Sequence, residues 1–218
     1  GNRSVGIDDR RHSECIILFT RYPEPGTTKT RLIPQLGPRG AADIQRQMTE
    51  HILAQALPLM TSRGLELEVR YEGGNVQSMR AWLGDAVTCA PQGPGDIGRR
   101  MARALRDAGD RGNTSSVVIG TDIPDITTAL LDRAFETLFD DTIVLGPASD
   151  GGYYLIGLPR KMPAQAAPGL FSNITWGTST VLQETCRRLE EQSLDYTLLE
   201  TLEDVDRPED LPVWERCR

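Results

Sequence analysis

The chain has 218 residues, a formal net charge of −7 and a pI near 5.0. This length is sufficient for one large α/β core. The acidic balance argues against general nucleic-acid binding, which requires a basic surface. No apolar run approaches the roughly 18 residues of a membrane-spanning helix, and four scattered cysteines with two histidines disfavour a Cys/His zinc site. We therefore expect one cytoplasmic protein with no membrane span and no nucleic-acid partner.

The first 13 residues are polar and carry no apolar signal-peptide core. We expect 1–13 to be a flexible N-terminal arm and 14–218 to form a single domain. Residues 15–19 are a continuous apolar run, typical of a parallel strand covered on both faces. Apolar side chains then recur at helical spacing over about 40–60. Residues 65–71 alternate between apolar and charged, as in a half-exposed strand.

Strand-like and helix-like segments continue to alternate along the chain. They are a helix over 76–83 capped by Asn75, a strand over 86–90, a helix over 97–108, a strand over 116–119, a helix that Thr127 caps and that ends near Leu138, and a strand over 142–145. This β-α repetition predicts a mostly parallel sheet with helices on both faces, a three-layer α/β/α domain.

The pattern changes after Gly146. A turn signal at 150–152 leads directly into a β-rich run at 153–158 with no intervening helix, which predicts a short antiparallel excursion. Thr178 or Ser179 is placed to cap the next helix, and 196–199 reads as a late strand. The acidic stretch 204–211 then leads into a short terminal helix.

Asp122 follows the 116–119 strand after a single glycine turn. In open α/β sheets, ligands bind outside the carboxyl ends of the strands. A carboxylate at that position is suited to hold Mg²⁺ or Mn²⁺ against a phosphate. The alternative is an ordinary turn aspartate. Asp125 comes after Pro124, which redirects the chain, so it is expected to cap the next helix and not to bind metal.

A basic loop, residues 20–32, follows the first strand. It supplies Arg21, Lys29 and Arg31 in an otherwise acidic protein, and such groups suit a di- or triphosphate. It is not a P-loop, because Thr28 precedes Lys29 where the P-loop requires glycine. The alternative is a solvated basic loop without a ligand.

A second loop matches G-x-G-x-x-G through Gly93, Gly95 and Gly98, and Asp122 lies near the acidic position of a dinucleotide fingerprint. The match follows the third expected strand and not the first, and Pro94 stiffens the turn that must approach a pyrophosphate. A dinucleotide-dependent oxidoreductase is therefore a distant alternative.

Several motifs together resemble a known family. They are TRYPEPGTTKTRL, LGPRGAA, QGPGDIGRRMARAL, IGTDIP, LGPASDGGYYLIGL, ITWGTSTV and DVDRPEDL. In this order they resemble the DUF2064 group, which includes proteins called radical-SAM/selenodomain-associated transferase 1, over about 15–211. The resemblance implies a GT-A fold, the nucleotide-diphospho-sugar transferase architecture, related to phospholactate and phosphoenolpyruvate guanylyltransferases. Arg21 departs from the lysine usual in the family, which keeps the charge but changes the donor geometry.

The resemblance, combined with side-chain chemistry, implies a set of site residues. Lys29 and Arg31 would neutralise donor phosphates with help from Arg21. The nucleobase would lie at Gln92 and Gly95, with Arg100 bracing that loop. Asp122 would bind Mg²⁺ or Mn²⁺, and Asp204 or Asp206 would complete the metal shell or cap the terminal helix. Asp150 is a further catalytic candidate or the first residue of a glycine turn, and Tyr153 and Trp176 would line the acceptor pocket.

These roles imply a metal-dependent transferase acting on a nucleotide sugar or nucleoside triphosphate and a small-molecule acceptor. The family label favours glycosyl transfer. Nucleotidyl transfer with release of pyrophosphate is the near alternative, because the same phosphate cradle serves both reactions when the acceptor is placed differently. A non-catalytic nucleotide-sensing module would keep the basic cradle but would need no divalent ion.

Overall fold

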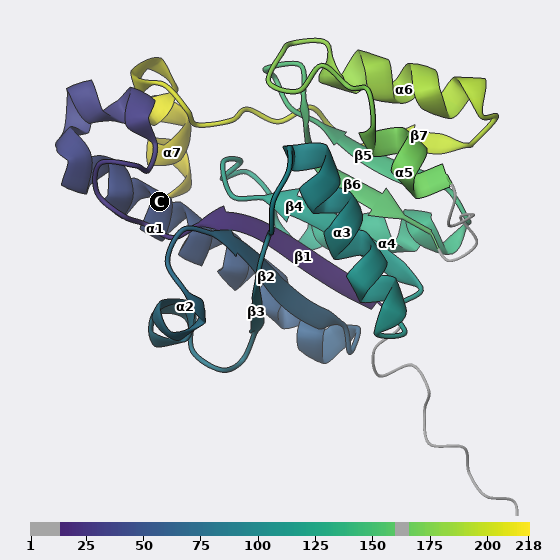
Figure 1. The fold of residues 1–218 in the computed structure, drawn as a ribbon, viewed down its shortest axis with the longest axis horizontal. Coiled ribbons are helices and arrows are strands. Elements are labelled where there is room, and N and C mark those ends of the chain that lie inside the picture. The colour runs from purple at the N-terminus through teal and green to yellow at the C-terminus, as the bar shows by residue number, and fades with distance from the viewer. Residues whose placement is uncertain (1–13, 160–165) are drawn as a thin grey trace, which may run out of the picture.

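The computed structural model describes residues 14–159 and 166–218, so the expected N-terminal arm lies outside the described residues. Within them, seven strands form one sheet in the order β3-β2-β1-β4-β6-β5-β7 (Figure 1). The strands are β1 (Glu14–Arg21), β2 (Glu66–Glu72), β3 (Thr88–Pro91), β4 (Ser115–Gly120), β5 (Ile143–Pro147), β6 (Tyr153–Leu158) and β7 (Tyr196–Leu198).

Most of the sheet is parallel. β1 pairs in parallel with β2 and β4, and β2 with β3. β6 is antiparallel to both β4 and β5, and β7 pairs in parallel with β5. Between Pro147 and Tyr153 the chain makes only a tight turn, so β6 enters the sheet in the reverse direction between β4 and β5. The predicted antiparallel excursion is thereby confirmed.

Helices cover both faces of the sheet and confirm the three-layer architecture (Figure 1). One core lies against α1, α2 and α4, and a second lies against α3, α5 and α6. Alternate β1 residues enter the two cores, with Ile16 and Leu18 in the first and Ile17 in the second, which explains the continuous apolar run. The helices are α1 (Ile33–Ser62), α2 (Val76–Leu83), α3 (Ile97–Asp110), α4 (Thr128–Phe139), α5 (Ala166–Phe171), α6 (Val181–Glu191) and α7 (Leu211–Cys217), with short 3-10 turns η1 (Thr30–Leu32) and η2 (Pro208–Asp210).

The predicted caps at Asn75 and Thr127 are confirmed, and the predicted cap of α6 is wrong. The Asn75 side chain accepts a hydrogen bond from the Ser78 backbone, and Thr127 accepts one from Leu130. Helix α6, however, begins after Thr180 with no side-chain cap, and not at Thr178 or Ser179. The Thr180 hydroxyl instead donates to the Glu184 carboxylate, which orders the loop before the helix.

Helix α1 is longer than the expected 40–60. It begins at Ile33, because proline is tolerated in a first helical turn and Gly37, at φ +74°, joins two helical segments across a kink. These residues interrupt the apolar periodicity, so the pattern predicted a loop there.

The expectation of a half-exposed β2 is wrong. Glu68 and Arg70 are buried, at 4% and 5% exposure, because the β2 face that carries them is covered by α3 and its C-terminal turn. The two side chains form an ion pair with each other. Arg70 also pairs with Asp107 at 3.0 Å, and Glu68 with Arg111 at 3.0 Å. Alternating charge therefore marked a buried ionic network and not a solvated face.

The C-terminal segment returns to the N-terminal half of the fold. Helix α7 packs beside α1, far from α3, α5 and α6 (Figure 1). A small third core joins Val205, Val213 and Trp214 to Met48 of α1. This packing brings the acidic stretch 204–210 to the carboxyl ends of β1 and β4. Within the described part of the chain, no helix combines the length and apolar character needed to cross a membrane.

Candidate functional site

The basic loop after β1 and the acidic turn after β4 lie at the same edge of the sheet, because these two strands are parallel neighbours. They border a cavity of about 600 Å³ at the carboxyl ends of the strands. Its lining includes Arg21, Lys29, Arg31, Gln45, Glu72, Gln92, Arg100, Thr121, Asp122 and Asp206. The structure thus brings the predicted phosphate-binding cations and the predicted metal-binding acids to one place.

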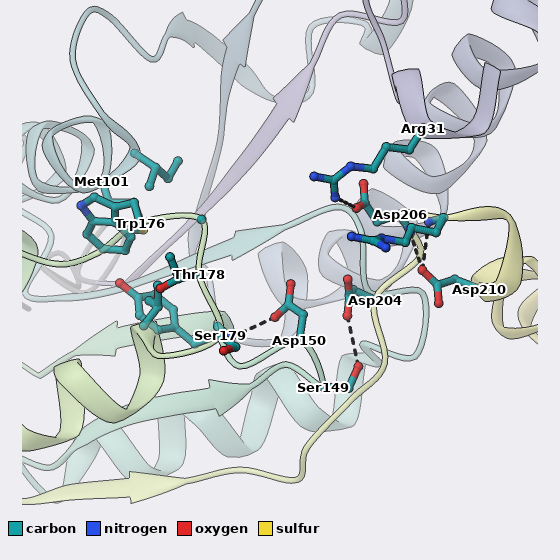
Figure 2. A pocket seen from close by; sticks show the side chains of 16 residues that line it. Arg31, Met101, Ser149, Asp150, Trp176, Thr178, Ser179, Asp204, Asp206 and Asp210 are labelled. Carbon is teal, nitrogen blue, oxygen red and sulfur yellow. Dashed lines mark hydrogen bonds and ion pairs between the residues drawn. The ribbon is translucent and has the colours of Figure 1, made fainter. Parts of the chain in front are cut away.

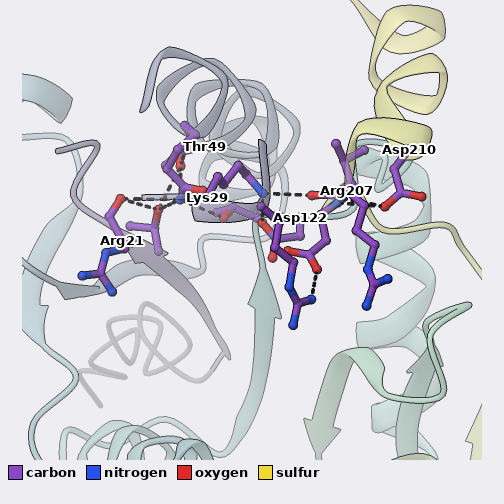
Figure 3. A network of polar contacts seen from close by, with 12 residues as sticks. Arg21, Lys29, Thr49, Asp122, Arg207 and Asp210 are labelled. Atoms are coloured by element: carbon purple, nitrogen blue, oxygen red, sulfur yellow. Dashed lines mark hydrogen bonds and ion pairs between the residues drawn. The ribbon is translucent and has the colours of Figure 1, made fainter. Parts of the chain in front are cut away.

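Lys29 makes the most constrained contact in this cavity. Its backbone is left-handed at φ +45°, and its side chain is only 5% exposed. The Nζ donates to Asp122 Oδ1 at 2.7 Å and to the carbonyl oxygen of Val205 at 2.9 Å (Figure 3). Asp122 itself remains open to the cavity, with 54% of its side chain exposed.

The two arginines of the loop also have acidic partners. Arg31 donates to Asp206 Oδ2, and Arg21 pairs with Glu72 at 3.2 Å. In the structure, therefore, the cations expected to meet donor phosphates are paired with carboxylates of the same cavity. Such exposed pairs are weak and open easily.

A buried polar network forms the floor of the cavity. Gln45 Nε2 lies 3.1 Å from Thr20 Oγ1 and 3.4 Å from the hydroxyls of both Thr49 and Thr121. The Thr20 and Thr49 hydroxyls share a further hydrogen bond at 2.8 Å. This network ties the ends of β1 and β4 to α1 and fixes the residue before Asp122. Sequence reasoning missed Gln45, whose only signal was a polar residue on the apolar face of a helix.

The predicted nucleobase loop lies against the same cavity. Arg100 donates from Nε to the Gly95 carbonyl oxygen at 2.9 Å and from Nη1 to Gln92 Oε1 at 3.2 Å. The Gln92 Nε2 donates to the Thr20 and Arg70 carbonyl oxygens, at 3.1 and 3.2 Å. Gln92 is thus held at both ends of its amide group, and Arg100 contacts both residues of the loop.

Each glycine of the G-x-G-x-x-G match has a packing reason to be glycine. A Cβ on Gly98 would lie 2.4 Å from the Phe171 carbonyl oxygen and 2.5 Å from the Trp176 ring. A Cβ on Gly93 would approach the Arg103 side chain, and a Cβ on Gly95 would approach the Arg99 side chain. Both glycines also have positive φ. Close packing at the start of α3 explains the motif without a dinucleotide.

A second cavity, of about 700 Å³, adjoins the first and shares Arg31, Ile97 and Asp206 with it. Asp150 and Asp204 lie on its wall (Figure 2). Asp150 Oδ1 accepts from the Gly152 backbone at 2.9 Å, and Asp204 Oδ1 accepts from Ser149 Oγ at 3.1 Å. Burial, and then the nearby Asp150 charge, raise the pKa of Asp204. The remaining lining includes Met101, Gly152, Tyr153, Trp176, Gly177, Thr178, Ser179, Val181, Arg207 and Asp210.

Tyr153 and Trp176 both line this second cavity. Their rings meet edge to face with centroids 6.5 Å apart. The Tyr153 hydroxyl is buried and has no hydrogen-bond partner within the described residues, and burial raises its pKa. One part of the cavity wall is therefore aromatic, and another part carries carboxylates and hydroxyl groups.

Two expected helix caps act otherwise. Asp125 accepts a hydrogen bond from Cys217 Sγ at 2.9 Å, while Thr127 caps α4. Before the terminal helix, Asp210 Oδ2 accepts hydrogen bonds from the backbone N–H groups of Asp206 and Arg207, at 3.1 and 2.9 Å. The carboxylates of Asp204 and Asp206 are thus directed into the cavities.

Asp122 and Asp206 in the first cavity are chemically suited to bind a divalent ion. Asp122 and Asp206 are carboxylates with part of their surface exposed, and oxygen ligands suit Mg²⁺ and Mn²⁺. No cluster of three or more acidic, histidine or cysteine side chains is positioned for a metal ion in the described parts of the chain. Two carboxylates at most would come from the protein, and phosphate oxygens and water would supply the other ligands, as is usual for Mg²⁺.

Comparisons with known proteins agree with this architecture. The DUF2064 family model, described as an uncharacterized protein conserved in bacteria, matches residues 53–178. A proposed nucleotide-diphospho-sugar transferase from Desulfovibrio desulfuricans G20 is 35% identical, with a TM-score of 0.86 over 94% of this chain and 87% of that chain. No curated protein matches the chain.

Two more distant structures share the fold. They are 4-diphosphocytidyl-2C-methyl-D-erythritol synthase from Anaerococcus prevotii (TM-score 0.61, 11% identity, 95% of both chains covered) and 2-C-methyl-D-erythritol 4-phosphate cytidylyltransferase from Thermus thermophilus (TM-score 0.57, 16% identity, 93% of this chain and 98% of that chain). The expected nucleotide-diphospho-sugar transferase fold is confirmed. With a family model that matches over half of its length and a relative 35% identical along nearly all of it, the chain belongs to the DUF2064 family.

Proposed function

We propose that the protein is a divalent-metal-dependent transferase that uses a nucleotide-activated donor and transfers a glycosyl group to a small-molecule acceptor. The observation that carries this proposal is the meeting of Lys29 with Asp122 and of Arg31 with Asp206 in one cavity. Cations for phosphates and oxygen ligands for a divalent ion then border the same space. A dinucleotide site would rely on a glycine turn and a helix dipole and would need no metal.

The donor would bind with its phosphates against the loop after β1. Lys29 and Arg31 would leave their carboxylate partners and contact phosphate oxygens, with Arg21 assisting. Gln92 and Gly95 would receive the nucleobase, and Arg100 would hold that loop in position. Asp122 and Asp206 would hold Mg²⁺ or Mn²⁺, which neutralises charge on the phosphates when bound. The positive side chains would stabilise the charge that develops on the leaving group.

The acceptor would occupy the second cavity. The two cavities share Arg31 and Asp206, so an acceptor oxygen placed there would face the reacting end of the donor. Tyr153 and Trp176 would pack against the apolar part of the acceptor. Asp150 would take the proton of the attacking hydroxyl, with Asp204 beside it. The D. desulfuricans relative, a proposed nucleotide-diphospho-sugar transferase, supports glycosyl transfer.

Nucleotidyl transfer is the second candidate. It is favoured by the number of cations at the first cavity, where Arg21, Lys29, Arg31 and Arg100 suit the larger charge of a triphosphate. The leaving group distinguishes the two reactions. A nucleoside triphosphate would release pyrophosphate, and a nucleotide sugar would release a nucleoside diphosphate.

Direct binding tests the proposal. Nucleoside triphosphates and nucleotide sugars are screened by thermal shift with and without Mn²⁺, and the best ligands are then titrated by calorimetry. Lys29→Ala with Arg31→Ala should weaken binding, by about 1.5–3 kcal/mol for each charge-assisted hydrogen bond that the substitutions remove. Arg46→Ala is the matched control, because Arg46 lies on α1, pairs with Asp43 and Glu50, and lines neither cavity. Equal nucleotide affinity in the double variant and the parent would contradict the proposal.

A further inference from the structure

Two ion pairs join three separate segments at the first cavity. Lys29 and Arg31 come from the loop after β1, Asp122 from the turn after β4, and Asp206 from the C-terminal segment. The Val205 backbone connects them further, because its N–H donates to the Asp122 carbonyl oxygen at 2.8 Å and its carbonyl accepts from Lys29. Each of these four charged groups therefore already has a partner within the protein.

The Lys29 pair is the more costly one to break. The Lys29 side chain is 5% exposed, so its ammonium group depends on Asp122 and the Val205 carbonyl for compensation. If a divalent ion bound Asp122 without phosphate, the Lys29 ammonium would lose its carboxylate partner and would lie beside another positive charge. A phosphate that bound Lys29 alone would lie next to the Asp122 and Asp206 carboxylates, which repel it.

When both ligands arrive together, each takes one partner of each pair. The metal ion takes the carboxylates, and the phosphates take the ammonium and guanidinium groups. No charge is then left without a partner. We propose that the Lys29–Asp122 pair, with a smaller contribution from the exposed Arg31–Asp206 pair, makes the divalent ion and the donor phosphates bind cooperatively and each bind weakly alone. This inference rests on the proposed function and deepens it, because it concerns regulation of the same site.

Cooperativity of this kind is reciprocal, since each ligand must change the affinity of the other by the same factor. The proposal also predicts that loss of a cavity cation changes the affinity for metal in a particular direction. Removal of the Lys29 charge should strengthen the binding of a metal ion alone, because Asp122 no longer has a competing partner. The same change should remove most of the gain in metal affinity that phosphate provides, because only the Arg31–Asp206 pair then remains.

The experiment uses the full chain with Mn²⁺ and inorganic pyrophosphate as probes. Mn²⁺ affinity is measured by calorimetry with and without pyrophosphate, and a protein-free titration corrects for the complex formed in solution. In the parent protein, pyrophosphate should tighten Mn²⁺ binding by at least about 5-fold, the lower end of typical coupling. In Lys29→Met, Mn²⁺ alone should bind about 5-fold or more tightly than in the parent, and pyrophosphate should add less than about 2-fold.

Two controls keep the result interpretable. Arg100→Gln removes one positive charge from the same cavity, but Arg100 contacts Gln92, Gly95 and Glu72 and neither candidate metal ligand. It should therefore raise Mn²⁺ affinity much less than Lys29→Met. Arg31→Gln changes an exposed side chain and repeats the test if Lys29→Met does not fold.

Independent binding of Mn²⁺ and pyrophosphate in the parent would overturn the proposal, as would a Lys29→Met affinity for Mn²⁺ no higher than that of Arg100→Gln. Neither result would affect the proposed transferase function if nucleotides still bind. Coupling between Mn²⁺ and pyrophosphate without any nucleotide binding would instead refute the proposed function but would still support the proposed cooperativity.

Discussion

Lys29 donates a hydrogen bond from Nζ to the carbonyl oxygen of Val205 at 2.9 Å, although 176 positions separate the two residues. The Val205 side chain is fully buried, in a core that contains Met48 and Trp214. The position of the cavity lysine is therefore fixed partly by the packing of α7 on α1. The C-terminal segment therefore forms part of the wall of the first cavity, to which it contributes Asp206.

Asp122→Asn should reduce metal binding while the fold survives. The substitution keeps the side-chain size but removes the charge that pairs with Lys29. We expect a loss of at least 10-fold in Mn²⁺ affinity, on the order of 1.4 kcal/mol, together with a modest loss of stability because a largely buried ammonium loses its partner. Calorimetry gives the affinity and circular dichroism the fold. Unchanged Mn²⁺ affinity would reject Asp122 as a ligand.

Gly98→Ala should destabilise the protein and disturb the second cavity. The new methyl group would overlap the Phe171 carbonyl oxygen and the Trp176 ring, and overpacking typically costs about 1–3 kcal/mol. Gly109→Ala in the same helix is the matched control. A Cβ there would meet no atom within 4 Å, so it should stabilise by roughly 0.4–1 kcal/mol. Thermal unfolding measures both, and equal melting temperatures would contradict the packing argument.

Arg70→Leu should cause a large loss of stability. Arg70 is 5% exposed and compensates Glu68 and Asp107. Removal of one member of a buried ion pair costs about 3–5 kcal/mol, because the remaining charge has no partner. The double variant Glu68→Leu with Arg70→Leu should cost less than the sum of the single changes. Urea unfolding of the four proteins measures the coupling, and strict additivity would show that the pair is not energetically linked.

The Cys15 thiol should be inert in the folded protein near neutral pH. Burial, followed by the nearby Glu66 and Glu68 charges, raises the pKa of Cys15 to about 12. The thiolate is the reactive form, and it is scarce below that pH, so alkylation should stay slow at pH 7–9 and rise when the protein unfolds. Mass spectrometry after iodoacetamide treatment at several pH values identifies the modified cysteine. Rapid labelling of native Cys15 at pH 8 would contradict its burial.

NADH and NADPH should not stabilise the protein beyond the effect of their adenosine phosphates. The glycines at 93, 95 and 98 have packing roles, and the cations lie on the loop after β1. A nucleoside phosphate with Mn²⁺ at about 100 times its dissociation constant should add roughly 2.7 kcal/mol, or roughly 5–11 °C in melting temperature. Stabilisation by NADH without metal, and by no other nucleotide, would restore the dinucleotide interpretation.

Local features of this chain were predictable from its sequence. The caps at Asn75 and Thr127 depend on neighbours three residues away, and the strand-turn-strand at 143–158 carries its own glycine signal. A mostly parallel sheet also places the loops that follow its strands at one edge, so the basic loop and Asp122 were expected on the same side of the sheet.

Contacts between distant segments were not predictable. The Lys29–Asp122 pair links residues 93 positions apart, and no periodicity specifies which acid a lysine will meet. Gln45 is a plain amide on a helix, and only the tertiary fold brings it near Thr20 and Thr121. Glu68 and Arg70 looked solvated because alternation shows which residues share a face but not whether a helix covers that face.

The late position of Val205 in the sequence has a consequence for synthesis on the ribosome. The strands β1 and β4 emerge and can pair well before Val205 and Trp214 leave the exit tunnel. During that interval the ammonium of Lys29 has no Val205 carbonyl to bind, and the first cavity lacks part of its wall. A nascent chain stalled before Val205 would thus have most of its sheet but an incomplete first cavity. Under the proposed function, the donor would then bind only after the C-terminal segment has emerged.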